Sequence, residues 1–261
     1  MNLAIHTRTT RPLDFRACLE HYAEAGVRGV GVWRDAIEDL GAREARRLLD
    51  DGGFGVPSLV RAGFFTDQTA AQIDDARRAI EDAHVLGAEM IVIVCGATPG
   101  ADQHDQRRLV ADALASLCDD AASAGVRLAV EPLHPMYAAD RSCICTMRSA
   151  RDLLDVIDHP AMGIAVDAFH VWWDPELASE IERSASRICA LHICDWLPRM
   201  EDMLEDRGLM GEGCIDLVDL VRRTRGMHVW TEVEIFSRRH WARDQREFVR
   251  DIVDAASRLE S

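Results

Sequence analysis

The apolar run Val126-Arg127-Leu128-Ala129-Val130-Glu131-Pro132-Leu133-His134-Pro135 ends in a carboxylate, a proline and a histidine. A buried strand that finishes in an acid is costly unless a metal ion or another cation lies there. Three later stretches repeat this design, with an apolar run that carries Asp167, His192 or Glu234 near its end. The pattern predicts four strands that bring Glu, Asp, His and Glu to one end of a sheet.

Outward from this stretch, short apolar runs alternate with longer amphipathic ones along the chain. The run 90–95 is apolar without interruption, as expected of a parallel strand covered on both faces by helices. The expected strands are 3–5, 27–33, 56–60, 90–95, 126–131, 163–167, 188–192 and 228–236, and the expected helices are 14–25, 35–49, 67–86, 103–124, 146–157, one from 175, 217–225 and 239–259. Eight strand–helix units without a break in composition predict an α/β protein with one domain, residues 1–261, folded as a closed (β/α)8 TIM barrel.

Length and composition limit the class of protein. A chain of 261 residues with 48% apolar residues can bury the core of one large domain. No apolar run approaches the roughly 18 residues of a membrane span, and the first residues lack a signal-peptide pattern, so we expect a cytoplasmic protein without a membrane partner. The formal net charge of −15 argues against a nucleic-acid partner, which requires a basic surface. The eight cysteines include no Cys-x-x-Cys pair, and we expect them to be reduced and structural.

The basic residues narrow the chemistry further. All 30 of them are arginines, and the chain has no lysine. Schiff-base aldolases, pyridoxal-phosphate enzymes and phosphate loops that need a lysine are therefore excluded. Proton transfer must then depend on His, Glu, Asp or a metal-bound water.

The strand-end residues form a chemically coherent set. In a parallel barrel the active site lies at the carboxyl ends of the strands, where Glu131, Asp167, His192 and Glu234 all fall. Three carboxylates and one imidazole suit one hard or borderline divalent ion, with Mn²⁺ first and Mg²⁺ or Co²⁺ as alternatives. Zn²⁺ is also allowed, although a zinc site is expected to contain more His or Cys. Glu232 points to the same side as Glu234 because side chains alternate along a strand, so either could be the last ligand.

These residues and their order resemble the xylose isomerase-like TIM-barrel superfamily of sugar and sugar-phosphate isomerases and epimerases. The resemblance runs from the first strand to the last helix and rests on Glu131-Pro-Leu-His134-Pro, Asp167-Ala-Phe-His170, His192-Ile-Cys-Asp195, Arg207 followed by Gly211-Glu212-Gly213, and Glu234-Ile-Phe. It implies one divalent metal held by Glu131, Asp167, His192 and Glu234, and it implies that His170 and Arg207 contact substrate oxygens. Glu234 is preferred to Glu232 because it matches the family's Glu-x-aromatic pattern and lies nearer the end of its strand.

Each of these roles has a simpler alternative. Glu131 and Asp167 could be buried acids paired with arginines. His192 could be a core histidine whose hydrogen bonds are satisfied. His170 could cap a loop or orient Asp167.

Other residues are expected around the substrate. His134 either touches the substrate or shapes its loop. Trp172 and its neighbour Trp173 could cover the apolar face of a sugar, or serve as a lid or dimer contact, which leaves a homo-oligomer open. Arg207 falls in an expected flexible loop without apolar surroundings, so we expect it to hold a substrate oxygen or a carboxylate-like intermediate. Together with Arg199 it could also hold a phosphate, although no Gly-rich phosphate cradle is evident.

Three functional classes fit such a site, and the expected partner is a small-molecule carbohydrate. The first is an isomerase or epimerase of a small sugar or keto-sugar, in which Glu131 and Glu234 are the catalytic bases that move a proton through a metal-stabilised enediolate. The second is a lyase on the same scaffold, a keto-inositol dehydratase or a 3-keto-glycoside β-eliminase. The third is an apurinic endonuclease, which needs more metal ligands where this chain has Glu205-Asp206-Arg207 and is disfavoured by the acidic composition. The sequence leaves the first two classes open.

Overall fold

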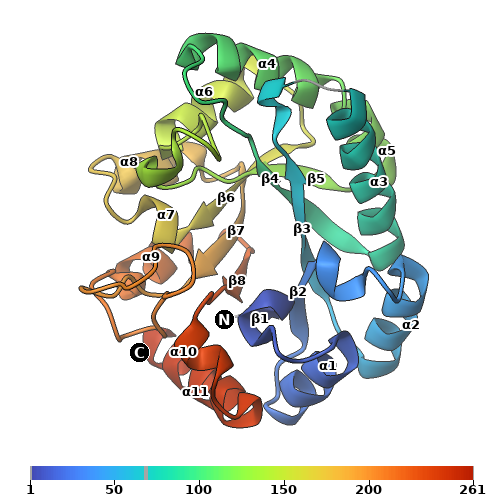
Figure 1. Ribbon diagram of the computed structural model, residues 1–261, viewed down its shortest axis with the longest axis vertical. Coiled ribbons are helices and arrows are strands. Elements are labelled where there is room, and N and C mark those ends of the chain that lie inside the picture. The colour runs from blue at the N-terminus through green and yellow to red at the C-terminus, as the bar shows by residue number, and fades with distance from the viewer. Residues whose placement is uncertain (1, 68–69, 261) are drawn as a thin grey trace.

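The protein folds as a closed parallel barrel, described for residues 2–67 and 70–260 of a computed structural model. The eight strands in this part of the chain pair in sequence order, and β1 also pairs with β8, so the sheet has no free edge. The strands are β1 (Leu3–His6), β2 (Gly29–Trp33), β3 (Val56–Gly63), β4 (Ala88–Val94), β5 (Arg127–Val130), β6 (Met162–Asp167), β7 (Ile188–Ile193) and β8 (Trp230–Val233). They surround the centre of the molecule, with the helices outside them (Figure 1). The predicted (β/α)8 barrel is confirmed.

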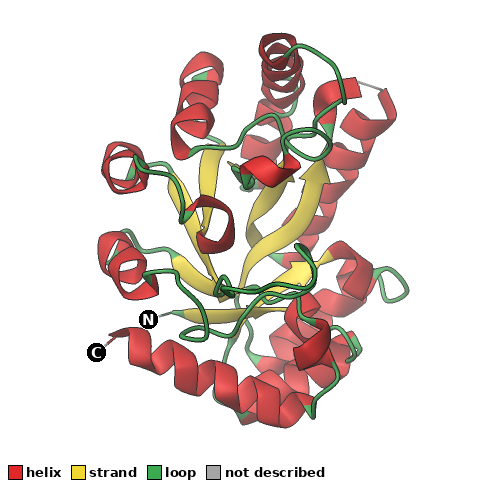
Figure 2. Ribbon diagram, turned by 60° about the vertical axis from the view of Figure 1, so that its left-hand side comes forward, coloured by secondary structure: helices red, strands yellow, loops and turns green. Residues whose placement is uncertain are grey.

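Helices cover the outer surface of the barrel (Figure 2). They are α1 (Phe15–Glu24), α2 (Ala42–Gly52), α3 (Ala70–Leu86), α4 (Gln103–Ala115), α5 (Cys118–Ala124), α6 (Met147–Ile157), α7 (Ala168–Val171), α8 (Leu177–Ser184), α9 (Leu217–Thr224), α10 (Arg238–Trp241) and α11 (Gln245–Ser257). Short 3₁₀ turns lie at Thr7–Thr10, Arg34–Ile37, Phe65–Asp67, Pro135–Tyr137 and Arg258–Glu260. Within the described ranges, none of the helices has the length and apolar character needed to span a membrane.

Several predicted helix boundaries are wrong, and local backbone interactions explain them. The helix expected over 103–124 breaks after α4, where the Ser116 hydroxyl donates to the Ala113 carbonyl oxygen at 2.7 Å. Such a side-chain bond competes with the helical backbone pattern. The helix expected over 239–259 restarts at α11, because the Asp244 carboxylate accepts from the Glu247 N–H and caps it. The helix expected from 35 begins as a 3₁₀ turn, and α2 starts only after Gly41, whose φ is +75°.

Two other predicted helix starts also shift. The start expected at 67 depends partly on positions 68–69, which lie outside the described residues, and α3 is described from Ala70. The helix expected from 175 begins at Leu177, after the Asp174 carboxylate has accepted from the Glu176 N–H at 3.0 Å.

Alternation along the strands directs polar side chains into the barrel. Successive side chains of a strand point to opposite faces, so residues two apart share a face. Alanines lie in the barrel two positions before three of the strand-end residues, as Ala129 before Glu131, Ala165 before Asp167 and Ala190 before His192. The alternate positions, such as Leu128, Ile164 and Leu191, belong to the main core that packs against the helices. The alternation of side chains along each strand therefore directs one set toward the helices and the other set, which includes the strand-end polar residues, into the barrel.

Gly31 makes room for a histidine ring inside the barrel. It lies opposite His6 in the pairing of β1 with β2. A Cβ atom at position 31 would lie 2.2 Å from Cδ2 of the His6 ring, far inside van der Waals contact. The absence of a side chain on Gly31 thus lets the His6 ring lie against the backbone of β2.

The cysteines behave as small apolar residues. All eight are free thiols, and most of them are buried. Burial raises the pKa of the Cys143 thiol and of the Cys145 thiol to about 11, which keeps both protonated at neutral pH. The buried thiols fit the expected structural role, whereas Cys214 is exposed.

Candidate metal and substrate site

Four side chains meet at the carboxyl ends of β5 to β8. Glu131 directly follows β5, Asp167 ends β6, His192 lies in β7, and Glu234 directly follows β8. All four are buried, and one ligand atom from each lies within 4.8 Å of those of the others. The structure therefore brings together the four residues expected to hold a metal, which we call the ligand cluster.

The electrostatics of the ligand cluster fit a divalent cation. Burial raises the pKa of Asp167 to about 7, an effect that Arg207 opposes and the charges of Glu234 and Glu131 reinforce. Three carboxylates held this close are stabilised when positive charge lies among them. Three carboxylate groups and one imidazole nitrogen are donors that Mn²⁺ and similar ions accept, so the residues present fit such an ion.

The imidazole of His192 lies between the ligand cluster and a deeper carboxylate. Its Nδ1 is 3.2 Å from Glu131 Oε1, and its Nε2 is 3.7 Å from Glu232 Oε1. Among the described residues, neither that Nε2 nor that oxygen has a hydrogen-bond partner. A carboxylate behind a metal-binding imidazole fixes the orientation of the ring and makes its other nitrogen a stronger ligand. Glu232 is placed to act on His192 in this way.

Glu232 belongs to a buried network that extends to β1 and β3. Its Oε2 accepts from the Ser58 hydroxyl at 2.5 Å and lies 2.9 Å from His6 Nε2. The other nitrogen of His6, Nδ1, is 3.0 Å from Glu234 Oε1. Burial opposes protonation of His6, but its hydrogen bonds to Glu232 and Glu234 outweigh burial and raise its pKa. Glu232 thus supports the ligand cluster from deeper inside the barrel, whereas Glu234 is a member of the cluster.

Sequence analysis missed His6 and Ser58 as parts of the site. His6 carries a signal that could have revealed it, because it ends an apolar strand just as Asp167 does. Ser58 carries no such signal. Its contact with Glu232 joins residues 174 positions apart, and a serine within an apolar strand is compatible with many environments.

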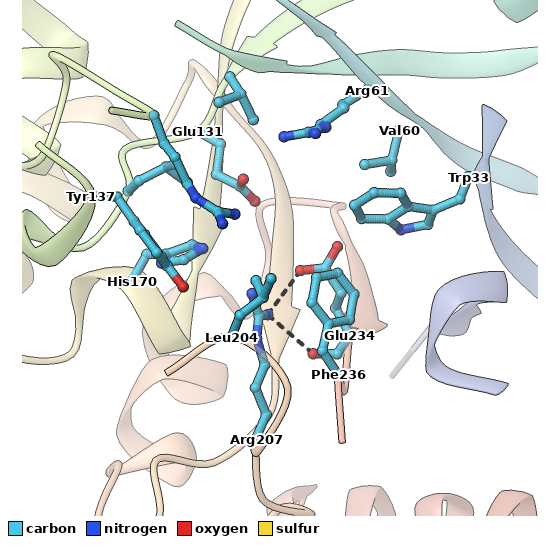
Figure 3. Close-up of a pocket in the computed structure, with 13 residues that line it drawn as sticks. Trp33, Val60, Arg61, Glu131, Tyr137, His170, Leu204, Arg207, Glu234 and Phe236 are labelled. Atoms are coloured by element: carbon cyan, nitrogen blue, oxygen red, sulfur yellow. Dashed lines mark hydrogen bonds and ion pairs between the residues drawn. The ribbon is translucent and has the colours of Figure 1, made fainter. Parts of the chain in front are cut away.

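The prediction that Arg207 lies in a flexible loop without apolar surroundings is wrong. Its guanidinium carbon lies 4.4 Å from the ring centroid of Phe169 and 4.4 Å from that of Phe236, and the residue is 2% exposed. Its Nη1 donates to Glu234 Oε2 at 2.9 Å, as Figure 3 shows, and to Asp167 Oδ2 at 3.3 Å. Arg207 is therefore a fixed cation that contacts two members of the ligand cluster.

His170 lies beside the ligand cluster. It is 3% exposed, its Nε2 is 3.5 Å from Asp167 Oδ2, and its Nδ1 accepts from the His134 main-chain N–H at 3.3 Å. Burial, together with the charge of Arg207, lowers its pKa well below the ordinary value. A neutral His170 ring whose Nδ1 accepts from His134 carries its proton on Nε2, which can donate to a substrate oxygen.

His134 and Trp172, both expected near the substrate, lie behind the cavity wall. Neither is among the residues that line the cavity. The His134 Nδ1 accepts from the Met136 N–H at 3.2 Å, and its ring stacks on Trp196 with centroids 5.0 Å apart. Trp172 packs against the same Trp196, with centroids 5.6 Å apart. Their contacts favour the alternative in which His134 shapes its loop and Trp172 supports it.

A cavity opens directly above the ligand cluster. Its volume is about 50 Å³. Glu131, Glu234, His170 and Arg207 line it, whereas Asp167 and His192 do not. Figure 3 shows other lining side chains, among them Trp33, Arg61 and Tyr137. Trp33 Nε1 also lies 3.2 Å from His6 Nδ1, which connects the cavity wall to the buried network.

A family model described as the xylose isomerase-like TIM barrel matches residues 19–252. The chain belongs to this family. The matched range includes the whole ligand cluster and Arg207, and the resemblance inferred from the short motifs is confirmed.

Three known proteins are similar to this chain over different lengths. Protein SMc04130 from Sinorhizobium meliloti 1021 has a solved structure, is 39% identical, and aligns with a TM-score of 0.94 over 99% of this chain and 98% of that chain. The IolI protein, solved with a binding zinc atom, is 18% identical, with a TM-score of 0.86 over 99% and 98% of the two chains. A curated enzyme, 3-dehydroshikimate dehydratase from Pseudomonas putida, is 27% identical over 195 residues, or 68% of this chain. This chain covers only 30% of the dehydratase's length.

Proposed function

We propose that this protein is a divalent-metal-dependent isomerase or epimerase that moves a proton at the carbon beside a carbonyl of a small sugar or keto-sugar. Glu131, Asp167, His192 and Glu234 would hold the ion. Mn²⁺ is the preferred ion for this mixed set of oxygen and nitrogen donors, with Mg²⁺, Co²⁺ and Zn²⁺ as alternatives. The zinc atom bound to the IolI protein supports a metal in a barrel of this shape.

The observation that carries the proposal is the unequal access of the ligand cluster to the cavity. Glu131 and Glu234 line it, whereas Asp167 and His192 are fully buried behind it. Only the two glutamates can therefore reach both an ion and a substrate. They follow strands β5 and β8, which are not neighbours in the barrel, so they approach the cavity from different directions.

Two carboxylates in this arrangement suit proton transfer. A bound divalent ion would supply positive charge that stabilises the enediolate oxygens after the carbon beside the carbonyl loses its proton. One glutamate accepts that proton, and the other can return a proton to the opposite face of the carbon, as an epimerase requires. Glu234 is held by His6 and Arg207, so this carboxylate does not have to be reoriented for the reaction.

The remaining cavity walls suit a polyhydroxylated substrate. His170 and Arg207 present ring nitrogens and N–H groups that can bond substrate oxygens. Trp33 and Phe236 add aromatic surface, which can cover the C–H faces of a sugar.

A lyase is the second candidate, and specific observations favour it. The curated relative is a 3-dehydroshikimate dehydratase, and the cavity of this chain contains arginines suited to an acidic substrate. Dehydration of a keto acid also begins with removal of a proton beside a carbonyl, and it differs in the departure of a hydroxyl group as water. The same two glutamates would then act as base and as proton donor to the leaving group.

Reaction in D₂O tests the proton-transfer chemistry of the Mn²⁺-loaded protein. A panel of ketoses, keto-inositols, 3-keto-glycosides and 3-dehydroshikimate, followed by NMR, should identify a compound that gains solvent deuterium beside its carbonyl. Glu131→Gln and Glu234→Gln should each slow that exchange by at least roughly a hundredfold, the lower end of general-base contributions. Glu182→Gln, on the exposed surface of α8, is the control with the same change of charge.

Two outcomes would contradict the mechanism. Full exchange in both glutamine variants would show that neither glutamate is the base. A converted compound that carries no deuterium would indicate hydride transfer between carbons.

A further inference from the structure

Two arginines in the cavity have no carboxylate partner. Arg61 and Arg141 both line the cavity above the ligand cluster and are half-buried. Within the described residues, neither side chain makes an ion pair or donates a side-chain hydrogen bond. Each guanidinium instead lies over an aromatic ring, Arg61 at 4.6 Å from the centroid of Phe64 and Arg141 at 4.7 Å from that of Tyr137. Both retain N–H donors for a ligand.

Unpaired arginines are unexpected in this protein, because its acidic residues outnumber its basic ones by 45 to 30. Many of its surface arginines are paired with carboxylates, as Arg34 is with Asp75 and Arg47 with Glu44. The two cavity arginines are close enough that the charge of Arg141, after burial, helps to lower the pKa of Arg61. Two like charges held near each other in a half-buried site are unfavourable unless an anion lies between them.

The strand that carries Arg61 is irregular at this residue. The pairing of β3 with β4 shifts register between Val60 and Ala62, so Arg61 is an extra residue on β3. Regular alternation would direct Val60 and Arg61 to opposite faces of the sheet. With the shift, both residues line the cavity, as Figure 3 shows. Irregularities of this kind commonly redirect a side chain next to an active site.

The charges of the ligand cluster are balanced without Arg61 and Arg141. Glu131, Asp167 and Glu234 carry three negative charges, which one divalent ion and Arg207 would balance. Glu232 lies deeper and is hydrogen-bonded by His6 and Ser58. The positive charges of Arg61 and Arg141 are then left for whatever occupies the cavity.

We propose that Arg61 and Arg141 form an oxyanion clamp that binds a carboxylate or phosphoryl group of the substrate while the substrate's carbonyl end faces Glu131 and Glu234. The substrate is thus an anionic keto-polyol or keto acid rather than a neutral sugar. The proposal rests on the proposed function for the position of the reacting carbon. Planar guanidinium groups bind both kinds of oxyanion through paired N–H donors.

Calorimetric titration of the Mn²⁺-loaded protein tests the clamp with three probes. Fructose and fructose 6-phosphate differ only in the phosphoryl group, and 3-dehydroshikimate supplies a carboxylate. At least one anionic probe should bind about tenfold or more tightly than fructose, and Arg61→Gln and Arg141→Gln should each weaken its binding by about tenfold or more. Metal content should not change in either variant. Tighter binding of fructose 6-phosphate alone would indicate that the substrate is a sugar phosphate. Tighter binding of 3-dehydroshikimate alone would indicate a keto acid.

Arg43→Gln is the matched control, because Arg43 is exposed on α2 and does not line the cavity. It removes the same charge and should leave the binding of every probe unchanged. Arg61→Lys should recover part of the affinity lost in Arg61→Gln, since it restores the charge without the planar fork. Circular dichroism of each variant should match that of the wild type.

The clamp is wrong if the anionic probes bind no more tightly than fructose at millimolar concentration, or if their binding survives both glutamine substitutions. Deuterium exchange separates this failure from that of the proposed function. Exchange into a neutral keto-sugar at equal rates in wild type and Arg61→Gln would reject the clamp and leave the proton-transfer function intact. Arginine-dependent binding of an anion without deuterium exchange into any compound would support the clamp and reject the proton-transfer function.

Discussion

Glu232 illustrates how a residue outside the ligand cluster can control it. Its two oxygens face different histidines, with Oε1 toward His192 and Oε2 toward His6. His192 belongs to the ligand cluster, and His6 contacts Glu234, which also belongs to it. The Glu232 carboxylate therefore faces one histidine of the ligand cluster and one histidine that contacts the cluster, although Glu232 does not line the cavity.

Replacing Glu232 with glutamine should weaken metal binding. Glutamine keeps the shape of the side chain but removes the charge that orients the two imidazoles, and losses of support of this kind typically cost about 10- to 100-fold in metal affinity. Competition of the purified variant with a chelator for Mn²⁺ measures the change. Glu182→Gln should bind Mn²⁺ as the wild type does. Equal affinities in Glu232→Gln and wild type would show that Glu232 does not support the site.

Single residues of the site could be predicted from the sequence where they end an apolar strand. Glu131, Asp167 and Glu234 each come at the end of an apolar run, and the closed barrel brings those ends together. Arg207 lacked such a signal, because its aromatic neighbours Phe169 and Phe236 come from other parts of the chain. The sequence could reveal its charge and its loop, but not the two rings that hold it.

At the scale of elements, the break between α10 and α11 creates a compact cluster around His240. The His240 ring stacks on Phe248 of α11, with centroids 4.4 Å apart and ring planes 6° from parallel. Arg239 Nη2 lies 3.1 Å from its Nε2, and Arg243 Nη1 lies 3.4 Å from its Nδ1. Burial and the charge of Arg239 lower the pKa of His240 to about 4, while Glu212 opposes the shift. The folded protein thus keeps this ring neutral.

The lowered pKa of His240 predicts that acid destabilises this end of the barrel. Between the unfolded pKa near 6.5 and the folded value of about 4, the unfolded chain binds a proton that the folded protein does not, so stability falls as the pH falls. Urea unfolding at about pH 7.5 and at about pH 5 should show a loss that is roughly 1 to 2 kcal/mol larger in wild type than in His240→Gln. His104→Gln, at an exposed position on α4, should retain the wild-type loss. Equal losses in wild type and His240→Gln would rule out this role for His240.

Element types followed from the sequence more reliably than element boundaries. Apolar runs located every strand, because a strand covered on both sides must be apolar. The breaks at Ser116 and before Asp244 depend on single side-chain hydrogen bonds within otherwise continuous helical patterns. The register shift at Arg61 depends on how β3 pairs with β4, and pairing is a property of two strands that one strand's sequence does not display.

At the scale of the whole molecule, an acidic chain surrounds a site that needs cations. The net charge is −15, and the ligand cluster places three of the carboxylates where water is largely excluded. A divalent ion that binds only the folded barrel also stabilises it by mass action. Function and stability are therefore expected to depend on the same ion.

The metal content of the purified protein tests the central claim most directly. After incubation with Mn²⁺ and removal of free ion, elemental analysis should find close to one ion per chain in the wild type. Asp167→Ala and His192→Ala should lose most of that ion, while Glu182→Gln should keep it, because only the first two remove members of the ligand cluster. Full occupancy in both alanine variants, or no bound ion in the wild type, would contradict the account.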